Sequence, residues 1–256
     1  MSTVSFVTGW PALMVNSSLV ISDIHLGLEY DYRKGGIKLP SQTVKLTKMA
    51  QELIDIAKPE RLIITGDLKH KVPGISFQET KEVPEFLSAL LDKVPVELVP
   101  GNHDAGIKSM IPSGIKVHRS VGFRMDDVYF GHGHTWPEKK AFECSHMIIG
   151  HRHPLVEFRD RLGYSFRERV WVKGKLDPVM LKRRYTEIPE KLPDVIVVPA
   201  FNPFLGGASY NRKISGTVKE QIGPLLNSMD ERKSLFFMLD GTMLGTLREI
   251  HGDKLN

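Results

Sequence analysis

Short aliphatic runs that end in polar, chemically capable residues dominate the first 153 positions of the chain. Runs of three to five aliphatic or β-branched residues bounded by glycine or proline predict buried strands. The runs, with the polar residues that follow them, are 19–21 into 22–25, 62–64 into 65–67, 96–99 into 100–104, 128–130 into 131–134 and 147–149 into 150–153. Because ligands in layered α/β folds bind beyond the carboxyl ends of strands, these five strand ends predict one shared site.

Helical periodicity separates the first three predicted strands. One helix has an apolar face formed by Leu46, Ala50, Leu53, Ile54 and Ala57. Ser41 can cap this helix, and Pro59 ends it. A second helix carries the apolar residues Phe86, Leu87, Leu90 and Leu91, with Pro84 either in its first turn or at a kink.

Helices become scarce after position 101, where strand-like segments cover 115–118, 122–130, 164–172, 195–198 and 234–239. The order strand–helix–strand–helix–strand followed by a meander predicts an α/β fold of two packed sheets with helices outside. We expect segment 180–193 to be a loop. Without repeats, low-complexity stretches or a linker, residues 1–256 are predicted to form a single domain.

Composition places the chain among globular proteins, with 41% hydrophobic and 25% charged residues. No apolar run approaches the roughly 20 residues that span a bilayer. The N-terminal segment also lacks the pattern of a signal peptide. The single cysteine, Cys144, excludes an internal disulfide and is expected to be a buried apolar residue. We therefore expect a cytoplasmic protein that has no membrane partner.

The net charge of +5 is concentrated between residues 151 and 185, where ten Lys or Arg face four acidic residues. Such a segment can attract anionic partners, including nucleic acid. The alternative is a solvated hairpin whose outward positions are Arg and Lys. The sequence gives no indication of the oligomeric state.

The strand ends supply the donors of a metal site. Asp23 and His25 are two residues apart, so in an extended backbone their side chains leave on the same side, as do His151 and His153. Glycines at the strand ends can let the backbone turn sharply. Carboxylate, carboxamide and imidazole donors without cysteine suit Mn²⁺, Fe²⁺, Co²⁺, Ni²⁺ or Zn²⁺. The donors are too many for one ion, and Asp67 is the natural carboxylate to bridge two. Alternatively, 101–104 is a turn with an Asx side-chain bond.

These motifs together resemble the signature of calcineurin-like metallophosphoesterases. The resemblance rests on Asp23-Ile-His25, Gly66-Asp67, Gly101-Asn-His-Asp104, His132 and Gly150-His-Arg-His153. Segments 26–29, 66–70 and 199–207, together with His153-Pro154, resemble an archaeal branch related to the nuclease SbcD, also found beside DNA ligases in bacteria. The resemblance implies a four-layer αββα sandwich with two mainly mixed sheets.

The resemblance also implies a role for each motif residue. Asp23, His25 and His153 would hold the first metal ion, with Asp67 bridging, and Asn102, His132 and His151 would hold the second. Mn²⁺ is the favoured ion of both sites. His103 would be the general acid, with Asp104 as its orienting partner. His134 would be a neighbour or substrate contact rather than a ligand, although it lies only two residues from His132.

The function implied is a two-metal phosphodiesterase or nuclease that acts on nucleotides or nucleic acid through a metal-bound hydroxide. A phosphomonoesterase on a metabolite or phosphoprotein is the first alternative, and a scaffold of this fold is the second. The intact His103 and ligand set argue against a scaffold. A DNA-repair partner is implied by the branch resemblance alone.

Several further residues have two interpretations. Lys69 and His70 either contact phosphate or are solvated. Tyr30 and Tyr32, with the cations at 33–34, either line a groove and stack on bases or belong to a surface loop. Arg152 is expected in a structural or rim position. Segment 202–207 is either a loop over the site or a plain turn.

Overall fold

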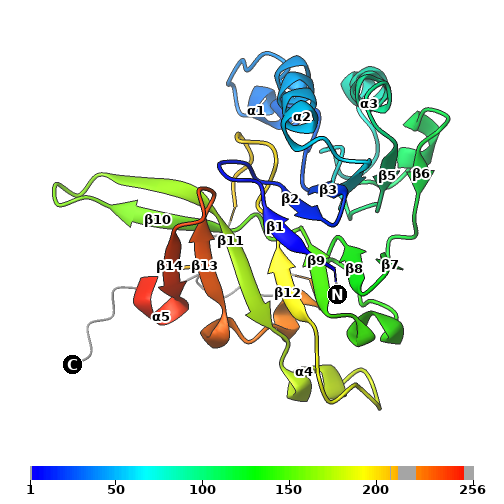
Figure 1. Ribbon diagram of the computed structural model, residues 1–256. Coiled ribbons are helices and arrows are strands. Elements are labelled where there is room, and N and C mark those ends of the chain that lie inside the picture. The colour runs from blue at the N-terminus through cyan, green and yellow to red at the C-terminus, as the bar shows by residue number, and fades with distance from the viewer. Residues whose placement is uncertain (1, 208, 213–222, 251–256) are drawn as a thin grey trace.

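The strands of the first half of the chain form a six-stranded sheet in the order β1-β2-β3-β4-β5-β6. The computed structural model describes residues 2–207, 209–212 and 223–250 (Figure 1). The strands are β1 (Val4–Phe6), β2 (Leu13–Val15), β3 (Ser18–Ile21), β4 (Arg61–Ile64), β5 (Val96–Leu98) and β6 (Lys116–Val117). From β3 to β6 the strands are parallel, whereas β1 and β2 are antiparallel.

The second sheet has the order β14-β13-β11-β12-β9-β8-β7, and β10 pairs with β11. Its strands are β7 (Phe123–Met125), β8 (Val128–Gly131), β9 (His146–Ile149), β10 (Leu155–Arg159), β11 (Ser165–Lys175), β12 (Asp194–Val197), β13 (Leu235–Met238) and β14 (Met243–Thr246). The prediction of a meander was wrong, because β8, β9 and β12 are parallel neighbours. Parallel neighbours need crossover connections rather than tight hairpins.

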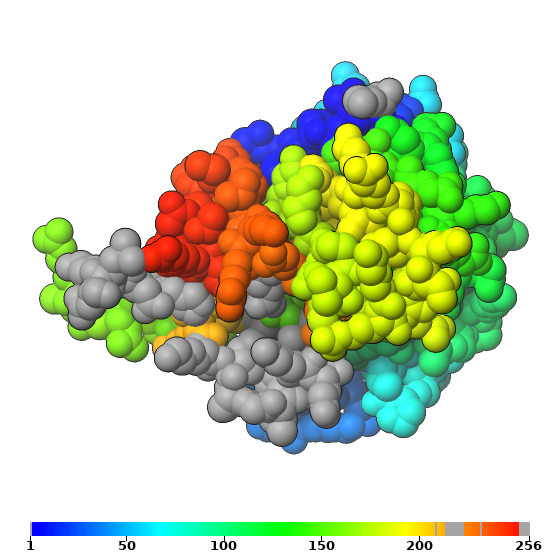
Figure 2. Space-filling model, turned by 90° about the horizontal axis from the view of Figure 1, so that it is seen from below, coloured from blue at the N-terminus to red at the C-terminus, as the bar shows by residue number. Residues whose placement is uncertain are grey.

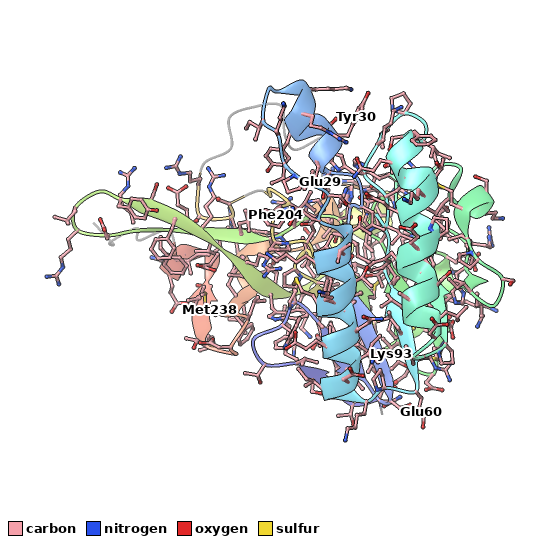
Figure 3. All side chains as sticks on the ribbon, turned by 90° about the horizontal axis from the view of Figure 1, so that it is seen from above. Glu29, Tyr30, Glu60, Lys93, Phe204 and Met238 are labelled. Atoms are coloured by element: carbon pink, nitrogen blue, oxygen red, sulfur yellow. The ribbon has the colours of Figure 1, made fainter. Side chains whose placement is uncertain are left out.

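Helices cover the outer face of each sheet, which confirms the predicted α/β fold of two mixed sheets flanked by helices. On the first sheet lie α2 (Thr43–Ala57) and α3 (Phe77–Leu91), side by side in the view from above (Figure 3). The second sheet is covered by the short elements η2 (Lys139–Glu143), α4 (Pro178–Lys182) and η4 (Leu226–Ser228), together with the segment that leads to β12 (Figure 2).

Alternate residues of the central strands serve two different cores. Leu19 and Ile21 of β3 pack with the helices, whereas Val20 packs with the second sheet. Between the sheets the ring of Phe6 stacks on that of Trp171, with 4.3 Å between centroids. Burial on both faces explains why these strands have continuous apolar runs rather than alternating ones.

Some predicted boundaries need correction. The segment 122–130 is two strands, β7 and β8, joined by a turn at Asp126, which has φ of 54°. The predicted loop at 180–193 begins inside α4. Pro84 lies in the interior of α3 rather than in its first turn. Short elements that were not predicted include α1 (Glu29–Lys34), η1 (Ile107–Met110), η5 (Glu231–Lys233) and α5 (Leu247–Ile250).

The basic segment is divided by β11. Together with β10, this strand forms a hairpin that projects from the body, while α4 follows its other end (Figure 1). β11 has 11 residues, and a strand of that length spans about 35 Å. Arginines of the hairpin and those near α4 therefore do not form one patch. Among the described helices, none has the length and apolarity that crossing a bilayer demands.

Candidate active site

Loops at the carboxyl ends of five parallel strands carry all the predicted metal ligands. Three of the strands belong to the first sheet and two to the second. The loop after β3 carries Asp23 and His25, the loop after β4 carries Asp67, the loop after β5 carries Asn102, the loop after β8 carries His132, and the loop after β9 carries His151 and His153. The site therefore lies where the two sheets meet and draws donors from both.

The first donor cluster contains Asp23, His25, Asp67 and His153. One donor atom from each residue lies within 4.8 Å of the others. Nε2 of His153 is 3.0 Å from Oδ1 of Asp23, and Nε2 of His25 is 3.4 Å from Oδ2 of Asp67. These are the residues that the sequence assigns to the first ion together with the bridge.

The second donor cluster contains Asp67, His132 and His151, again with donor atoms within 4.8 Å of one another. Nε2 of His132 lies 3.2 Å from Oδ2 of Asp67 and 3.1 Å from Oδ1 of Asn102. Asp67 belongs to both clusters, which is the position that a bridging carboxylate must have. His134 is in neither cluster, although its ring centroid is 5.2 Å from that of His132.

Hydrogen bonds at Nδ1 orient the imidazoles so that Nε2 faces the carboxylates. Nδ1 of His132 donates to the carbonyl oxygen of Thr65 over 2.8 Å, and Nδ1 of His153 lies 3.2 Å from that of Gly206. Metal-binding histidines are commonly held in this way. Nε2 of His25 is buried and has no hydrogen-bond partner in the described part of the chain. A buried nitrogen aimed at a carboxylate without a hydrogen bond fits a metal ligand.

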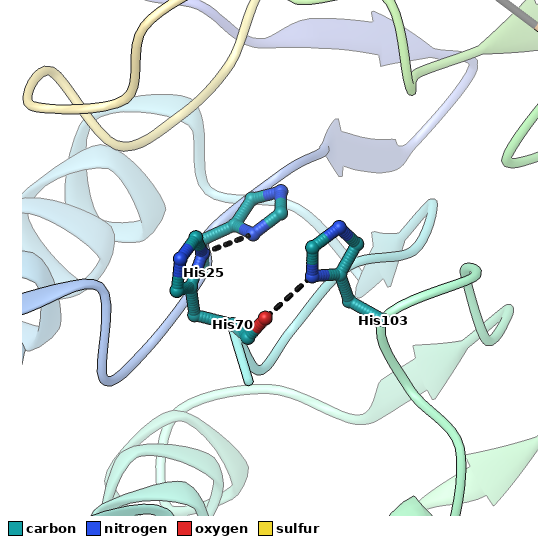
Figure 4. Close-up of side chains that lie close together, drawn as sticks. All are labelled: His25, His70 and His103. Carbon is teal, nitrogen blue, oxygen red and sulfur yellow. Dashed lines mark hydrogen bonds between the residues drawn. The ribbon is translucent and has the colours of Figure 1, made fainter. Parts of the chain in front are cut away.

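His70 lies between Asp31 of α1 and His25 of the first cluster, and Figure 4 shows its bond to His25. Its Nε2 lies 3.0 Å from Oδ2 of Asp31, and its Nδ1 lies 3.0 Å from Nδ1 of His25. When Nε2 of His70 donates to the carboxylate, its Nδ1 accepts the proton of His25 Nδ1, so Nε2 of His25 is left for an ion. His70 thus contacts a predicted ligand, and Asp31 is a site residue that the sequence analysis did not identify.

His103 lies beside the two donor clusters that share Asp67 and belongs to neither of them. Its backbone N–H donates to Oδ1 of Asp67 over 2.9 Å. Its ring nitrogen Nδ1 donates to the carbonyl oxygen of His70 over 2.5 Å (Figure 4). With Nδ1 held by a carbonyl, Nε2 is the nitrogen that can exchange a proton with a ligand.

Asp104 does not orient the His103 ring, contrary to the sequence prediction. Its carboxylate accepts backbone N–H groups of Leu68 (2.9 Å), Lys69 (3.1 Å) and Gly101 (2.8 Å). The bond from Gly101 comes from a residue three positions earlier, so it is not the Asx bond to a following N–H that was the alternative interpretation. Asp104 therefore fastens the loops after β4 and β5 to each other, and burial, together with the nearby Asp67, raises its pKa to about 6.

Lys69 supports a loop rather than facing the site or the solvent. The residue is fully buried. Its ammonium group donates to the carbonyl oxygens of Lys71 (2.6 Å) and Gly74 (2.9 Å). Neither sequence interpretation, phosphate contact or solvation, fits these contacts.

Opposite charges in the site shift its pKa values. Burial raises the pKa of Asp67, but His132 and His25 lower it by more, so it lies well below its usual range. Burial lowers the pKa of His132, but the two carboxylates raise it to about 9. Burial lowers the pKa of His25 and, with help from His132, that of His151, each to about 4. Burial also lowers the pKa of His153, but the carboxylate of Asp23 likewise raises it above its usual value. Without ions His132 therefore holds a proton while His25 and His151 are neutral, and ion binding must displace that proton.

The backbone is left-handed at five of the seven predicted ligands, so the argument from an extended backbone was wrong. Positive φ is rare for residues other than glycine, and it clusters at functional sites. The values are 56° at Asp23, 48° at His25, 50° at Asp67, 75° at His151 and 45° at His153. Successive reversals of the loop, not strand alternation, aim these side chains at the site.

Two glycines are required by close approach rather than by turning. Gly101 and Gly150 do not have positive φ. A Cβ on Gly101 would overlap Oδ1 of Asp67, and one on Gly150 would overlap Ser22 and lie 2.6 Å from Oδ2 of Asp23. Only a hydrogen in place of a side chain lets these strand ends pass the carboxylates.

The segment 199–207 backs the first cluster. Asn202 is buried, and its Nδ2 donates to the carbonyl oxygen of Ile24 over 2.9 Å. The carbonyl of Gly206 faces His153, as described above. Of the two interpretations, these contacts fit a loop packed against the site better than a plain turn. Arg152, next to it in the fold, places its guanidinium carbon 4.5 Å from the ring centroid of Tyr210, which fits the expected structural position.

Donor clusters that share a buried carboxylate at the meeting edge of two sheets are typical of two-metal hydrolases. A family model described as Calcineurin-like phosphoesterase matches residues 17–217. The chain therefore belongs to the calcineurin-like phosphoesterases, a family that depends on a dinuclear metal centre. This is the family that the sequence motifs resemble.

Two curated relatives are serine/threonine-protein phosphatases named CPPED1. The Mus musculus protein is 35% identical over 69 residues, which cover 25% of this chain and 22% of the relative. The Danio rerio protein is 34% identical over 93 residues, covering 33% and 30%. The chain thus spans less than a third of the length of these relatives.

A solved structure has the same fold over nearly the whole chain. The nuclease MPE of Pseudomonas putida superposes with a TM-score of 0.54 and 18% identity, covering 94% of this chain and 98% of that one. At this identity the likeness concerns the fold alone.

Proposed function

We propose that the protein is a two-metal phosphodiesterase or nuclease that acts on nucleotides or nucleic acid. The observation that carries the proposal is the membership of Asp67 in both donor clusters, with His103 bonded to the same carboxylate. Donors come from both sheets, which supports a single domain over residues 1–256.

Each donor cluster would hold one ion. Asp23, His25 and His153 would bind the first and Asn102, His132 and His151 the second, with Asp67 between them. When bound, two such ions neutralise phosphate charge and lower the pKa of a water. The donor set fits Mn²⁺, which we favour, and also Fe²⁺, Co²⁺, Ni²⁺ or Zn²⁺.

His103 is the proposed proton donor to the leaving oxygen. The carbonyl of His70 holds its Nδ1, so the proton would leave from Nε2. Asp104 acts on this group indirectly, by holding together the two loops that carry Asp67 and His103. The ring of His134 lies beside that of His132 in the second cluster. Its buried Nδ1 has no hydrogen-bond partner in the described part of the chain, which supports a substrate contact.

A diester substrate is favoured over a monoester by the nuclease of the same fold and by the resemblance to the SbcD-related branch. That branch also supports a DNA-repair partner, and the single cysteine supports a cytoplasmic location. The second candidate is a phosphomonoesterase, including a phosphoprotein phosphatase, because CPPED1 is a relative over part of the chain. Both reactions would use the same residues.

The discriminating experiment compares substrates for the Mn²⁺-loaded protein. We expect hydrolysis of bis(p-nitrophenyl) phosphate and DNA, with little of p-nitrophenyl phosphate. Hydrolysis of the monoester alone would overturn the diesterase proposal. Failure to hydrolyse any of them with Mn²⁺, Fe²⁺, Co²⁺, Ni²⁺ or Zn²⁺ would favour the scaffold alternative.

A further inference from the structure

A groove lies beside the candidate active site, between α1 and the start of α3. Its volume is about 750 Å³, and Tyr30, Arg33, Lys34, Phe77 and Lys81 are among its lining residues. We propose that this groove binds a single strand of nucleic acid and leads it to the donor clusters. The proposal rests on the proposed function and adds the form of the substrate and the surface that holds it.

The lining of the groove carries more positive than negative charge. In the described part of the chain no ion pair involves Arg33, Lys34 or Lys81. The lining carboxylate of Glu82 is occupied by hydrogen bonds from Thr43 Oγ1 (2.7 Å) and Gln78 Nε2 (3.0 Å). Hydrogen bonds from these neutral groups leave Glu82 its charge, so the lining carries three cations against one carboxylate, a net charge of +2 that suits the backbone of a polyanion.

Two aromatic rings in the groove suit unpaired bases. Phe77, the first residue of α3, is 90% exposed, which is unusual for a side chain of its size. The ring of Tyr30 has Nζ of Lys34 at 4.6 Å and Nζ of Lys71 at 5.8 Å from its centroid. An aromatic face flanked by ammonium groups can stack on a base while the cations contact its phosphates.

The position of the groove connects it to the site. Seen from above, Tyr30 lies at the end of the molecule opposite Glu60 and Lys93, which follow the carboxyl ends of α2 and α3 (Figure 3). On the same helix as Tyr30, Asp31 bonds to His70, which in turn contacts His25 and His103. A strand in the groove would therefore pass next to the proposed proton donor.

A single strand fits this surface better than a duplex does. In a duplex the bases are paired and stacked, so rings such as those of Phe77 and Tyr30 cannot reach their faces. Cations alone would serve either form. The exposed aromatics are thus the feature that selects single strands.

The test measures binding of a labelled single-stranded phosphorothioate oligothymidylate to the full chain with Mn²⁺. We expect Phe77→Ala and Tyr30→Ala each to raise Kd roughly tenfold, since stacking platforms are sensitive to alanine. Lys81→Gln should reduce the slope of log K against log salt by about 0.7, the value for one phosphate contact on a single strand.

The matched controls are an exposed aromatic and an exposed lysine outside the groove. Tyr164, which is 70% exposed, lies on the β10–β11 hairpin, and Lys182 lies on α4. The control variants are Tyr164→Ala and Lys182→Gln. Both should bind the oligonucleotide as the wild type does. Weaker binding by Tyr164→Ala with unchanged binding by Phe77→Ala would place the strand on the hairpin and overturn the proposal.

The experiments distinguish a failure of the groove proposal from a failure of the proposed function. If the wild type hydrolyses diesters but Phe77→Ala and Tyr30→Ala bind as tightly as it does, the groove is wrong and the function stands. If the wild type hydrolyses no diester but the two variants still weaken binding, the groove stands and the function is wrong.

Discussion

At the scale of single residues, Asp67 is the ligand that the two donor clusters share. Its carboxylate faces His25 and His132 and accepts the backbone N–H of His103. We expect Asp67→Asn to lose more than about a hundredfold in activity, because even residues that only support a ligand are worth 10–100-fold. Metal analysis should show fewer than two ions per chain. Asp55→Asn, an exposed carboxylate on α2, is the control; full activity and two ions in Asp67→Asn would remove the bridge.

His103 is expected to matter most for poor leaving groups. Its Nε2 proton would assist an alkoxide, whereas p-nitrophenolate leaves without help. We expect His103→Ala to reduce DNA hydrolysis by about 10²–10⁴-fold and bis(p-nitrophenyl) phosphate hydrolysis far less. Metal content should stay at the wild-type level. Equal losses on both substrates would contradict a role in proton donation.

The raised pKa of His132 makes the metal-free protein sensitive to alkaline pH. The pKa is about 9 in the folded state, whereas an unperturbed histidine has a pKa of about 6.5. Its contribution to stability is therefore complete below pH 6.5 and is lost as pH rises through 9. In chelator, the free energy of unfolding in urea should fall on the order of 2 kcal/mol over this range. His132→Gln should abolish the fall and His146→Gln should keep it; a fall that persists in His132→Gln would refute this assignment.

At the scale of elements, α3 fixes the loop that carries His70. Buried Glu79 accepts from the N–H groups of His70 (3.0 Å), Lys71 (2.6 Å) and Ser76 (2.6 Å) in the capping box of the helix. We expect Glu79→Gln to lower the free energy of unfolding by about 1–3 kcal/mol, because it leaves buried N–H groups poorly paired. The exposed Glu85→Gln on the same helix should change it by less than about 0.5 kcal/mol. Thermal denaturation compares the two.

Strand ends were predictable because apolar runs and the donors that follow them are local patterns. The two-sheet fold and the five ligand loops follow from such patterns, as does α2 with its apolar face. α1 has only six residues and no apolar stripe, so nothing local marks it. Asp31 acts through His70, which is 39 positions away, and no local pattern reports such a pairing.

Side-chain direction was the least predictable property of the loops. Spacing placed Asp23 near His25, but strand alternation was the wrong reason, since both residues have positive φ. Proximity in sequence likewise suggested that Asp104 orients His103, whereas its carboxylate turns back to backbone N–H groups. Loop dihedrals depend on tertiary contacts, so sequence spacing alone does not determine them.

At the scale of the whole molecule, the site joins the two sheets. Asp23 and Asp67 belong to loops of the first sheet, whereas His132 and His153 belong to loops of the second. Ions bound there would stabilise the folded chain by about 2.7 kcal/mol at a hundredfold excess over Kd. We expect Mn²⁺ to raise Tm by at least about 5 °C over chelated protein. Asp67→Asn should show a smaller rise, and an equal rise would place the stabilising ions elsewhere.

The left-handed backbone of the ligand loops has a consequence for the rate of metal uptake. Each such residue costs about 1–2 kcal/mol relative to the right-handed form, and folding itself meets this cost. The donors are thus in position before any ion arrives, and capture needs no slow rearrangement of the loops. Uptake should then be limited by dehydration of the ion and departure of the His132 proton, and so should accelerate as pH rises toward 9. A glycine at any of these positions would remove the backbone strain but would also remove a metal donor. Strain at these positions therefore cannot be lowered by glycine without a loss in the rate or affinity of metal binding.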